Sequence, residues 1–180
     1  TFHKINIPLE NKTGVDIGGG TPLGDPHVVR VSSDKFFELN RDTDNKKFDI
    51  IFIDGSHLRE DVESDVLNSL EFLNEGGTIV MHDCNPPGFH WQERVQSAYV
   101  SGWNGDTWKA FVKLRATRND LNMFVVDTDF GCGVVQRGEQ RILDIDLEKD
   151  MTYEMLETHR KEWLNLKSIQ EFNKLVESEK

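Results

Sequence analysis

Long apolar runs are absent from this sequence, and none exceeds the four-residue run Ile50–Ile53. A helix that crosses a bilayer needs roughly 20 apolar residues in succession, so no such helix is expected and no membrane partner is predicted. Hydrophobic residues nevertheless make up 37% of the 180 positions. That share is typical of a globular domain, and the length is sufficient for one domain with a sizeable core.

Positive charge is scarce. Lysine and arginine number 21 against 32 aspartates and glutamates, which gives a net charge of −11. Such a chain repels phosphate backbones and anionic lipids, so nucleic acid is not an expected partner. The partner that we expect is a small-molecule acceptor, and the sequence leaves a homo-oligomer open.

Cysteine is also rare, because only Cys84 and Cys132 are present and they form no CxxC motif. The chain starts at Thr1 without a basic-then-apolar leader. These features together predict a reduced, cytoplasmic setting. No ligand-type residues close to Cys84 complete a tetrahedral set, so we expect no zinc site there.

What the sequence does contain is an alternation of apolar runs and turn signals that is typical of α/β proteins. Two strands that flank one helix favour a parallel βαβ unit, and residues 123–136 favour an antiparallel strand pair. We therefore predict a doubly wound, mainly parallel α/β domain over 1–180, with a core in 1–137 and a helical tail in 138–180. Strands are expected at 13–16, 27–31, 48–54, 78–82, 123–127 and 133–136, and helices at 34–39, 60–75, around 108–114 and in the tail.

Four local patterns refine this prediction. The continuous apolar residues of 48–54 indicate a strand buried on both faces. Gly76–Gly77 is expected to end the helix that follows this strand. Ser33 is placed to cap a short helix, and Ser168 with Glu171 forms an S-x-x-E capping box before the last helix.

Polar side chains occur where several of the expected strands end. In open α/β sheets, ligands bind beyond the carboxyl ends of the strands. A single aspartate at such a position is more often a turn former or a helix cap, but several at one edge favour a binding site. The residues concerned are Asp16, Ser32, Ser33, Asp34, Asp54, His57, His82 and Asp83.

Two of these strand ends carry a family resemblance. FDIIFIDGSH, followed by a helix and then LNEGGTIVMHDCNPP, resembles the fourth and fifth strands of class I S-adenosylmethionine-dependent methyltransferases. The similar subgroup has D-G-x-H after the fourth strand and G-G-x-I-V-x-H-D around the fifth. WNGDTWKAFVKLR and MFVVDTDFGCGVV are similar too, so the resemblance covers about residues 12–137. It implies a Rossmann-like sheet of strand order 3-2-1-4-5-7-6 and S-adenosylmethionine as cofactor.

The glycine-rich loop of this family follows its first strand. Val15–Thr21 looks like the family's D-x-G-x-G motif, but only about six residues separate it from the strand at His27. The family has a helix of about three turns at that point. We therefore favour a register in which Asp16 ends the second strand, with the first strand and the glycine loop expected before Thr1. The register in which Val15–Thr21 is the glycine loop stays open.

The resemblance also implies roles for single residues. Asp16 would accept hydrogen bonds from the ribose hydroxyls of the cofactor, because a carboxylate offers two acceptors side by side. Ser32, Ser33 or Asp34 would lie near the adenine. Asp54, at the end of the fourth strand, would face the methyl-donor sulfur and the acceptor.

Methyl transfer to oxygen also requires removal of a proton from the acceptor, and His57 and His82 are the candidate bases. Asp54 and Asp83 are candidate ligands of Mg²⁺, with Asn85 as a third. His82 stands where some metal-binding relatives have a second acid. His57 is equally well explained as the N-terminal residue of a helix, bonded to backbone.

The segment 83–106 is long for a connector, which is typical of a functional loop or lid. Trp103 and Trp108 would either fill the core or stack on a sugar or an aromatic acceptor. The predicted function is methyl transfer from S-adenosylmethionine to an oxygen of a small polar or sugar-like acceptor. The alternative is a non-catalytic methyltransferase-like binding or assembly module. A nicotinamide-dependent enzyme is disfavoured, because GGGTPLG does not open a helix.

Overall fold

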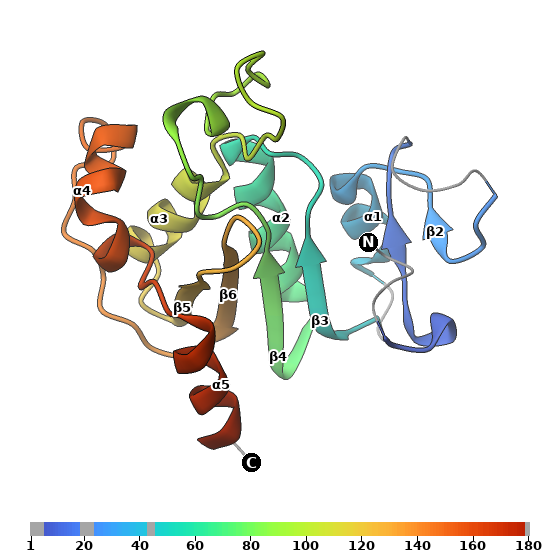
Figure 1. Ribbon diagram of the computed structural model, residues 1–180. Coiled ribbons are helices and arrows are strands. Elements are labelled where there is room, and N and C mark those ends of the chain that lie inside the picture. Colours follow the sequence, from blue (N-terminus) through green and yellow to red (C-terminus); the bar gives the residue numbers. More distant parts are fainter. Residues whose placement is uncertain (1–5, 19–23, 43–45, 179–180) are drawn as a thin grey trace. The chain divides into compact units, whose positions relative to one another are not determined.

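The computed structural model describes residues 6–18, 24–42 and 46–178, which form α/β structure (Figure 1). The chain divides into two compact units, unit 1 (1–46) and unit 2 (47–180), and each is described by itself. The predicted α/β class is confirmed. The single domain over 1–180 stays a prediction.

Unit 1 is a small parallel ribbon with one helix. The short segment after Ser32 is helical because the Ser32 Oγ accepts a hydrogen bond from the Lys35 backbone N at 3.2 Å. The cap is therefore Ser32 and not Ser33, since Ser32 is still extended (φ −65°, ψ 157°) when the helix begins. The elements are a 3₁₀ turn η2 (Leu9–Asn11), β1 (Gly14–Val15), β2 (Val28–Val29) and α1 (Ser33–Asn40), and β1 pairs with β2 in parallel.

Unit 2 holds a four-stranded sheet in the order β3-β4-β6-β5. β3 and β4 are parallel, whereas β6 is antiparallel to both β4 and β5. The elements are β3 (Phe48–Ile53), α2 (Arg59–Glu71), β4 (Leu73–Met81), a 3₁₀ turn η3 (Phe89–Trp91), α3 (Thr107–Thr117), β5 (Leu121–Val126), β6 (Cys132–Arg137), α4 (Tyr153–Trp163) and α5 (Ile169–Ser178). This order matches the 4-5-7-6 half of the strand order that the resemblance implies. In unit 1, β1 pairs only with β2 among the described residues, and the choice between the two registers stays open.

Helices cover both faces of the sheet in unit 2. α2 and α3 lie side by side behind it in Figure 1, and their Val66 and Phe111 are fully buried against strand residues such as Ile79. On the other face α5 covers β5 and β6, where the rings of Phe172 and Phe124 lie 6.1 Å apart. This two-sided cover is the doubly wound arrangement predicted from the sequence.

The burial of β3 differs from the prediction. Ile53 is 8% exposed, but Ile50 is 59% and Phe52 is 40% exposed. β3 is an edge strand of this four-stranded sheet, and α5 covers only the strands at the opposite edge. Continuous apolar residues therefore did not indicate burial on both faces here.

The end of α2 also differs from the prediction. The helix ends at Glu71 instead of at Gly76–Gly77, and β4 already begins at Leu73. The chain joins the sheet this early because the backbone N of Phe48 donates to the carbonyl of Phe72 at 2.9 Å. The first of the two glycines has a left-handed φ of 72° and lies in an irregularity of the β3–β4 ladder.

The C-terminal helices belong to the same core. Leu156 and Trp163 of α4 are buried in it. The capping box before α5 is confirmed, because the Ser168 backbone N donates to the Glu171 carboxylate at 2.7 Å and the Glu171 N donates to the Ser168 hydroxyl at 3.2 Å. No helix within the described ranges is both long and apolar enough to cross a membrane.

Candidate active site

Four of the predicted site residues meet at the carboxyl ends of β3 and β4. Asp54 follows β3 directly, and its Oδ1 lies 3.3 Å from His82 Nδ1 and 3.9 Å from His57 Nε2. Asp83 follows β4, and its Oδ2 lies 3.1 Å from His82 Nδ1 and 3.4 Å from His57 Nε2. Because the two strands are parallel neighbours, their ends bring the four side chains into one cluster. We call these residues the four-residue cluster.

His57 is held by the loop that precedes α3. Its Nδ1 lies 2.7 Å from the carbonyl oxygen of Trp103, and the two rings stack with centroids 4.9 Å apart. A carbonyl only accepts hydrogen bonds, so Nδ1 carries a proton and Nε2 faces Asp54 and Asp83. In the neutral imidazole the lone pair then lies on Nε2, and this is the form that a general base or a metal ligand requires.

His82 is surrounded by three carboxylates. Its Nδ1 faces Asp54 and Asp83, and its Nε2 lies 3.2 Å from Asp129 Oδ2. The neighbouring carboxylates, first Asp54 and then Asp83, raise the pKa of His82 to about 11. The imidazole is therefore protonated at neutral pH and cannot accept a proton there, which leaves His57 as the base that the geometry favours.

The proton on His82 should make stability depend on pH. Its folded-state pKa of about 11 exceeds the ordinary value of 6.5, so this contribution is complete below pH 6.5 and is lost as the pH rises toward 11. We expect the Tm of the native protein to fall more steeply between pH 6.5 and 10 than the Tm of His82→Gln. His90→Gln, which replaces a histidine of η3 outside the cluster, serves as control. Equal slopes of Tm against pH for native protein and His82→Gln would contradict the expectation.

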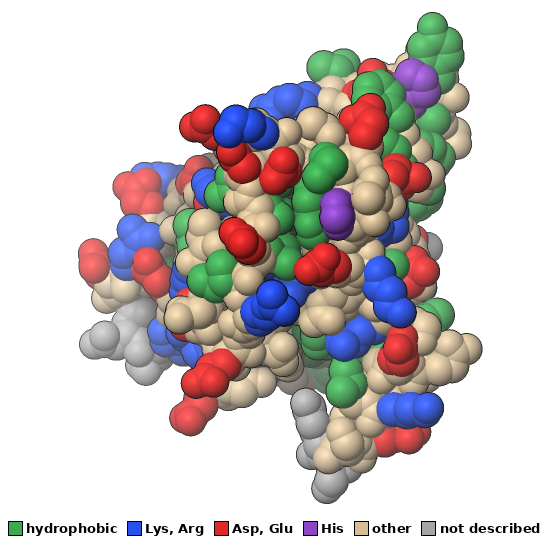
Figure 2. Space-filling model, turned by 90° about the vertical axis from the view of Figure 1, so that its left-hand side faces the viewer, with side chains coloured by type: hydrophobic (Ala, Val, Ile, Leu, Met, Phe, Trp, Pro, Cys, Tyr) green, Lys and Arg blue, Asp and Glu red, His purple; other side chains and the backbone are tan. Residues whose placement is uncertain are grey.

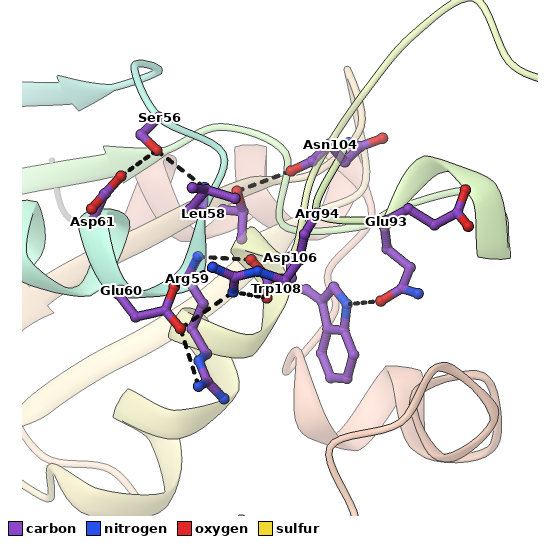
Figure 3. Close-up of polar contacts among 12 residues, drawn as sticks. Ser56, Leu58, Arg59, Glu60, Asp61, Glu93, Arg94, Asn104, Asp106 and Trp108 are labelled. Carbon is purple, nitrogen blue, oxygen red and sulfur yellow. Dashed lines mark hydrogen bonds and ion pairs between the residues drawn. The ribbon is translucent and has the colours of Figure 1, made fainter. Parts of the chain in front are cut away.

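Asp106 fastens the loop before α3 to the start of α2. Its Oδ1 accepts a hydrogen bond from the Arg59 backbone N at 2.8 Å, and its Oδ2 pairs with Arg94 at 2.8 Å (Figure 3). Arg94 also pairs with Glu60 on α2 at 2.9 Å. A carboxylate 47 residues further along the chain thus caps the helix. Asp54 makes no such bond, so its interpretation as the cap of α2 is wrong.

The cluster could hold a divalent cation. Asp54, His57 and Asp83 each offer one ligand atom, and these atoms lie within 4.8 Å of one another. Two carboxylates and an imidazole are common ligands of divalent metals. Asn85, the third ligand suggested by the sequence, points elsewhere, since its amide donates to Asp127 at 3.0 Å and accepts from Arg160. His57 takes its place in the donor set.

A cavity of about 440 Å³ adjoins the cluster through Asp129, which belongs to its lining and pairs with His82. Most of its lining residues are polar, and both Asp129 and Phe130 have a left-handed backbone, with φ of 45° and 60°. The lining residues are Asn85, Pro87, Asp127, Thr128, Asp129, Phe130, Glu157 and Arg160.

A second cavity of about 440 Å³ is lined by α3, the segment 141–145 and α4, and contains none of the four-residue cluster. Its buried Arg115 donates to the backbone carbonyl of Trp163 at 2.9 Å and is thus occupied by the fold. The face that includes α4 carries interspersed acidic and basic side chains, with no broad area of one sign (Figure 2). We assign no site to this cavity.

Four of the five residues predicted to bind the cofactor lie in unit 1, and the fifth, Asp54, lies in unit 2. Asp16 ends β1, and its carboxylate accepts from the Gly18 backbone N at 2.8 Å and pairs with Arg30 at 3.3 Å. Ser32 caps α1, and Ser33 and Asp34 form its first turn. Whether these residues share a cleft with the cluster of unit 2 stays a prediction. Residues 19–21 of the glycine motif lie outside the described residues.

Trp103 of the long loop and Trp108 of α3 differ in role. Trp108 is fully buried, and its Nε1 donates to Gln92 Oε1 at 3.3 Å, so it belongs to the core. Trp103 is only partly buried and stacks on His57, while its Nε1 donates to the Glu93 carbonyl at 2.6 Å. The sequence marked this loop as functional but did not show that it holds His57.

Residues 17–84, which include the ends of both β3 and β4, match a family model described as a methyltransferase domain. The resemblance to methyltransferases is therefore confirmed for this segment. The match ends at Cys84, directly after the methyltransferase-like His82–Asp83 pair. No curated protein matches the chain.

Two solved structures are similar at low identity. One is a protein from Corynebacterium glutamicum, 12% identical, with a TM-score of 0.41 over 65% of this chain and 51% of that one. The other is the MycE methyltransferase of the mycinamycin biosynthetic pathway, in complex with Mg, SAH and mycinamycin VI. It is 16% identical, with a TM-score of 0.41 over 82% of this chain and 42% of that one. The chain thus spans about half the length of these proteins or less.

Proposed function

We propose that this protein transfers the methyl group of S-adenosylmethionine to an oxygen of a small polar or sugar-like acceptor. The observation that carries the proposal is the four-residue cluster at the ends of two parallel strands, within a segment that matches a methyltransferase domain. Ionisable side chains that converge in this way at the ligand edge of an α/β sheet are typical of active sites.

His57 would remove the proton from the acceptor hydroxyl. Its Nδ1 is bonded to the Trp103 carbonyl, so Nε2 is the nitrogen that can take up the proton. His82 would stay charged between Asp54 and Asp83 and hold the two carboxylates in place. The side chain of His57 is 20% exposed, which allows an acceptor to approach it.

Asp54, His57 and Asp83 would hold Mg²⁺ or a similar divalent cation. When bound, the cation would polarise the acceptor hydroxyl and lower its pKa. With the cation bound, Nε2 of His57 would be a ligand and the acceptor proton would pass to solvent, whereas without the cation His57 would be the base. Asp54, whose side chain is 33% exposed, would meet both the acceptor and the methyl donor.

The acceptor would enter the cavity beside Asp129. Carboxylates of Asp127, Asp129 and Glu157 line this cavity, and they accept hydrogen bonds from hydroxyl groups. The ring of Phe130 is 42% exposed and stacks on Trp91 with centroids 5.1 Å apart. Carboxylates that bind hydroxyl groups, next to an exposed aromatic ring, favour a sugar-like molecule as the methyl acceptor.

Binding of S-adenosylhomocysteine to the native, full-length protein tests the proposal. We expect measurable binding by isothermal titration and at least about tenfold weaker binding of Asp16→Ala, because a carboxylate that accepts from both ribose hydroxyls is worth about 1.4 kcal/mol or more. Repeating the titration with Mg²⁺ shows whether the cation and the cofactor bind together.

Glu38→Ala is the matched control, since it removes one carboxylate from α1 of the same unit without touching Asp16. Equal affinity of Asp16→Ala and Glu38→Ala would contradict the role of Asp16. If the native protein does not bind S-adenosylhomocysteine at all, the non-catalytic binding or assembly module becomes the better interpretation.

A further inference from the structure

One buried amide holds the carboxylate of Asp83. The Nδ2 of Asn104 donates to Asp83 Oδ1 at 2.7 Å, whereas Oδ2 faces His57 and His82. Both partners are almost fully enclosed, with Asp83 5% and Asn104 1% exposed. The bond therefore fixes which oxygen of Asp83 points into the four-residue cluster.

The backbone fixes the position of Asn104 in turn. Its N donates to the Trp91 carbonyl at 2.9 Å, and its carbonyl accepts from the Thr107 hydroxyl at 3.0 Å. The next residue, Gly105, has a left-handed φ of 58°, and an added Cβ would lie 2.0 Å from the His57 carbonyl oxygen. The close contact between Gly105 and the His57 backbone thus holds the loop that carries the Asn104 amide.

The orientation of the amide leaves its own oxygen without a partner. Asn104 Oδ1 is buried and makes no hydrogen bond to any residue that the structure describes. Turning the amide over would place this oxygen against Asp83 Oδ1, so that two acceptors would face each other. An unpaired buried acceptor costs free energy, and here that cost is the consequence of donating to Asp83.

We propose that Asn104 is a positioning residue, which orients the Asp83 carboxylate so that Oδ2 completes the cation site with Asp54 and His57. This inference rests on the proposed function. A neutral amide suits the task, because it holds the carboxylate without cancelling the charge that attracts the cation, as lysine or arginine would. Asn104 acts only through Asp83 and reaches neither Asp54 nor His57 by a side-chain bond of its own.

Titration of the native protein with Mn²⁺, followed by electron paramagnetic resonance, tests the proposal without any acceptor. We expect Asn104→Ala to weaken Mn²⁺ binding about 10- to 100-fold, the usual effect of losing a partner that orients a metal ligand. Asn104→Leu keeps the branching of the side chain and removes the donor without adding charge, and it serves as the second variant if Asn104→Ala does not fold. In an Asp83→Ala background, Asn104→Ala should cause no further loss of Mn²⁺ affinity.

Asn74→Ala is the matched control. It removes another side-chain amide that donates to an aspartate, Asp49, at the opposite end of β3 and β4, so Mn²⁺ affinity should stay within twofold of the native value. If both Asn104 variants bind Mn²⁺ like the native protein while Asp54→Ala does not, the role of Asn104 is overturned and the cation site stands. If the native protein binds no Mn²⁺, the cation part of the proposed function and this inference are overturned together.

Discussion

Replacing Asp54 with alanine is expected to lower methyl transfer at least about 100-fold and to leave the fold intact. The carboxylate lies where β3 ends and faces His57 and His82, at distances of 3.9 and 3.3 Å. One third of its side chain is exposed and it caps no helix, so the fold should persist, although loss of the pair with protonated His82 should lower the free energy of unfolding by about 1 to 2 kcal/mol. A large loss of activity with only this modest loss of stability separates a site residue from a structural one.

The measurement combines a melting curve with methyl transfer from labelled S-adenosylmethionine to a panel of small sugar-like acceptors. Asp49→Ala is the matched control, because Asp49 lies at the opposite end of the same strand. Its carboxylate accepts a hydrogen bond from Asn74 and lies outside the four-residue cluster. Loss of stability in Asp54→Ala together with native activity would assign this residue to the fold and would contradict the proposed site.

Gly105→Ala is expected to have the largest effect on stability, about 3 kcal/mol or more. The new Cβ would lie 2.0 Å from the His57 carbonyl oxygen, which already accepts a hydrogen bond from the Asp106 backbone N at 3.0 Å. Either the loop or the chain around His57 must move, and the left-handed φ of 58° adds its own cost. Because this contact holds His57, activity and Mn²⁺ affinity should fall as well.

Gly76→Ala separates the cost of the steric clash from the cost of the left-handed backbone. Gly76 also has a left-handed φ, 72°, but nothing lies within 4 Å of an added Cβ. Only the backbone cost remains, so urea unfolding should show a loss of about 1 kcal/mol. Similar losses in the two variants would mean that the loop relaxes away from His57 without cost, and that it does not hold the histidine.

The order of helices and strands was predictable because it depends on local patterns. The apolar run before Asp54 and the run before His82 became parallel neighbours, and the pattern at Ser168 and Glu171 became a capping box. Boundaries were less predictable. α2 ends at Glu71, since pairing with β3 draws the next residues into the sheet, and no local signal at that point competes with such long-range pairing.

The sequence by itself determined the fold class and the four-residue cluster. Parallel strands present their carboxyl ends at one edge, so residues that directly follow two neighbouring strands must lie close together. Asp54, His57, His82 and Asp83 meet for this reason, whereas the place of Asp16 and of residues 32–34 at the same edge stays a prediction.

Only the tertiary structure decided how these side chains are held. Asn104 donates to Asp83 across 21 positions, Trp103 accepts from His57 across 46, and Asp106 caps α2 across 47. Each contact depends on the path of the loop before α3, which no periodicity in the sequence describes. The tertiary structure also settled the charge of His82, because the pKa of an imidazole depends on how many carboxylates surround it. Local patterns fix which residues reach the edge of the sheet, whereas distances between distant segments fix what those residues can do there.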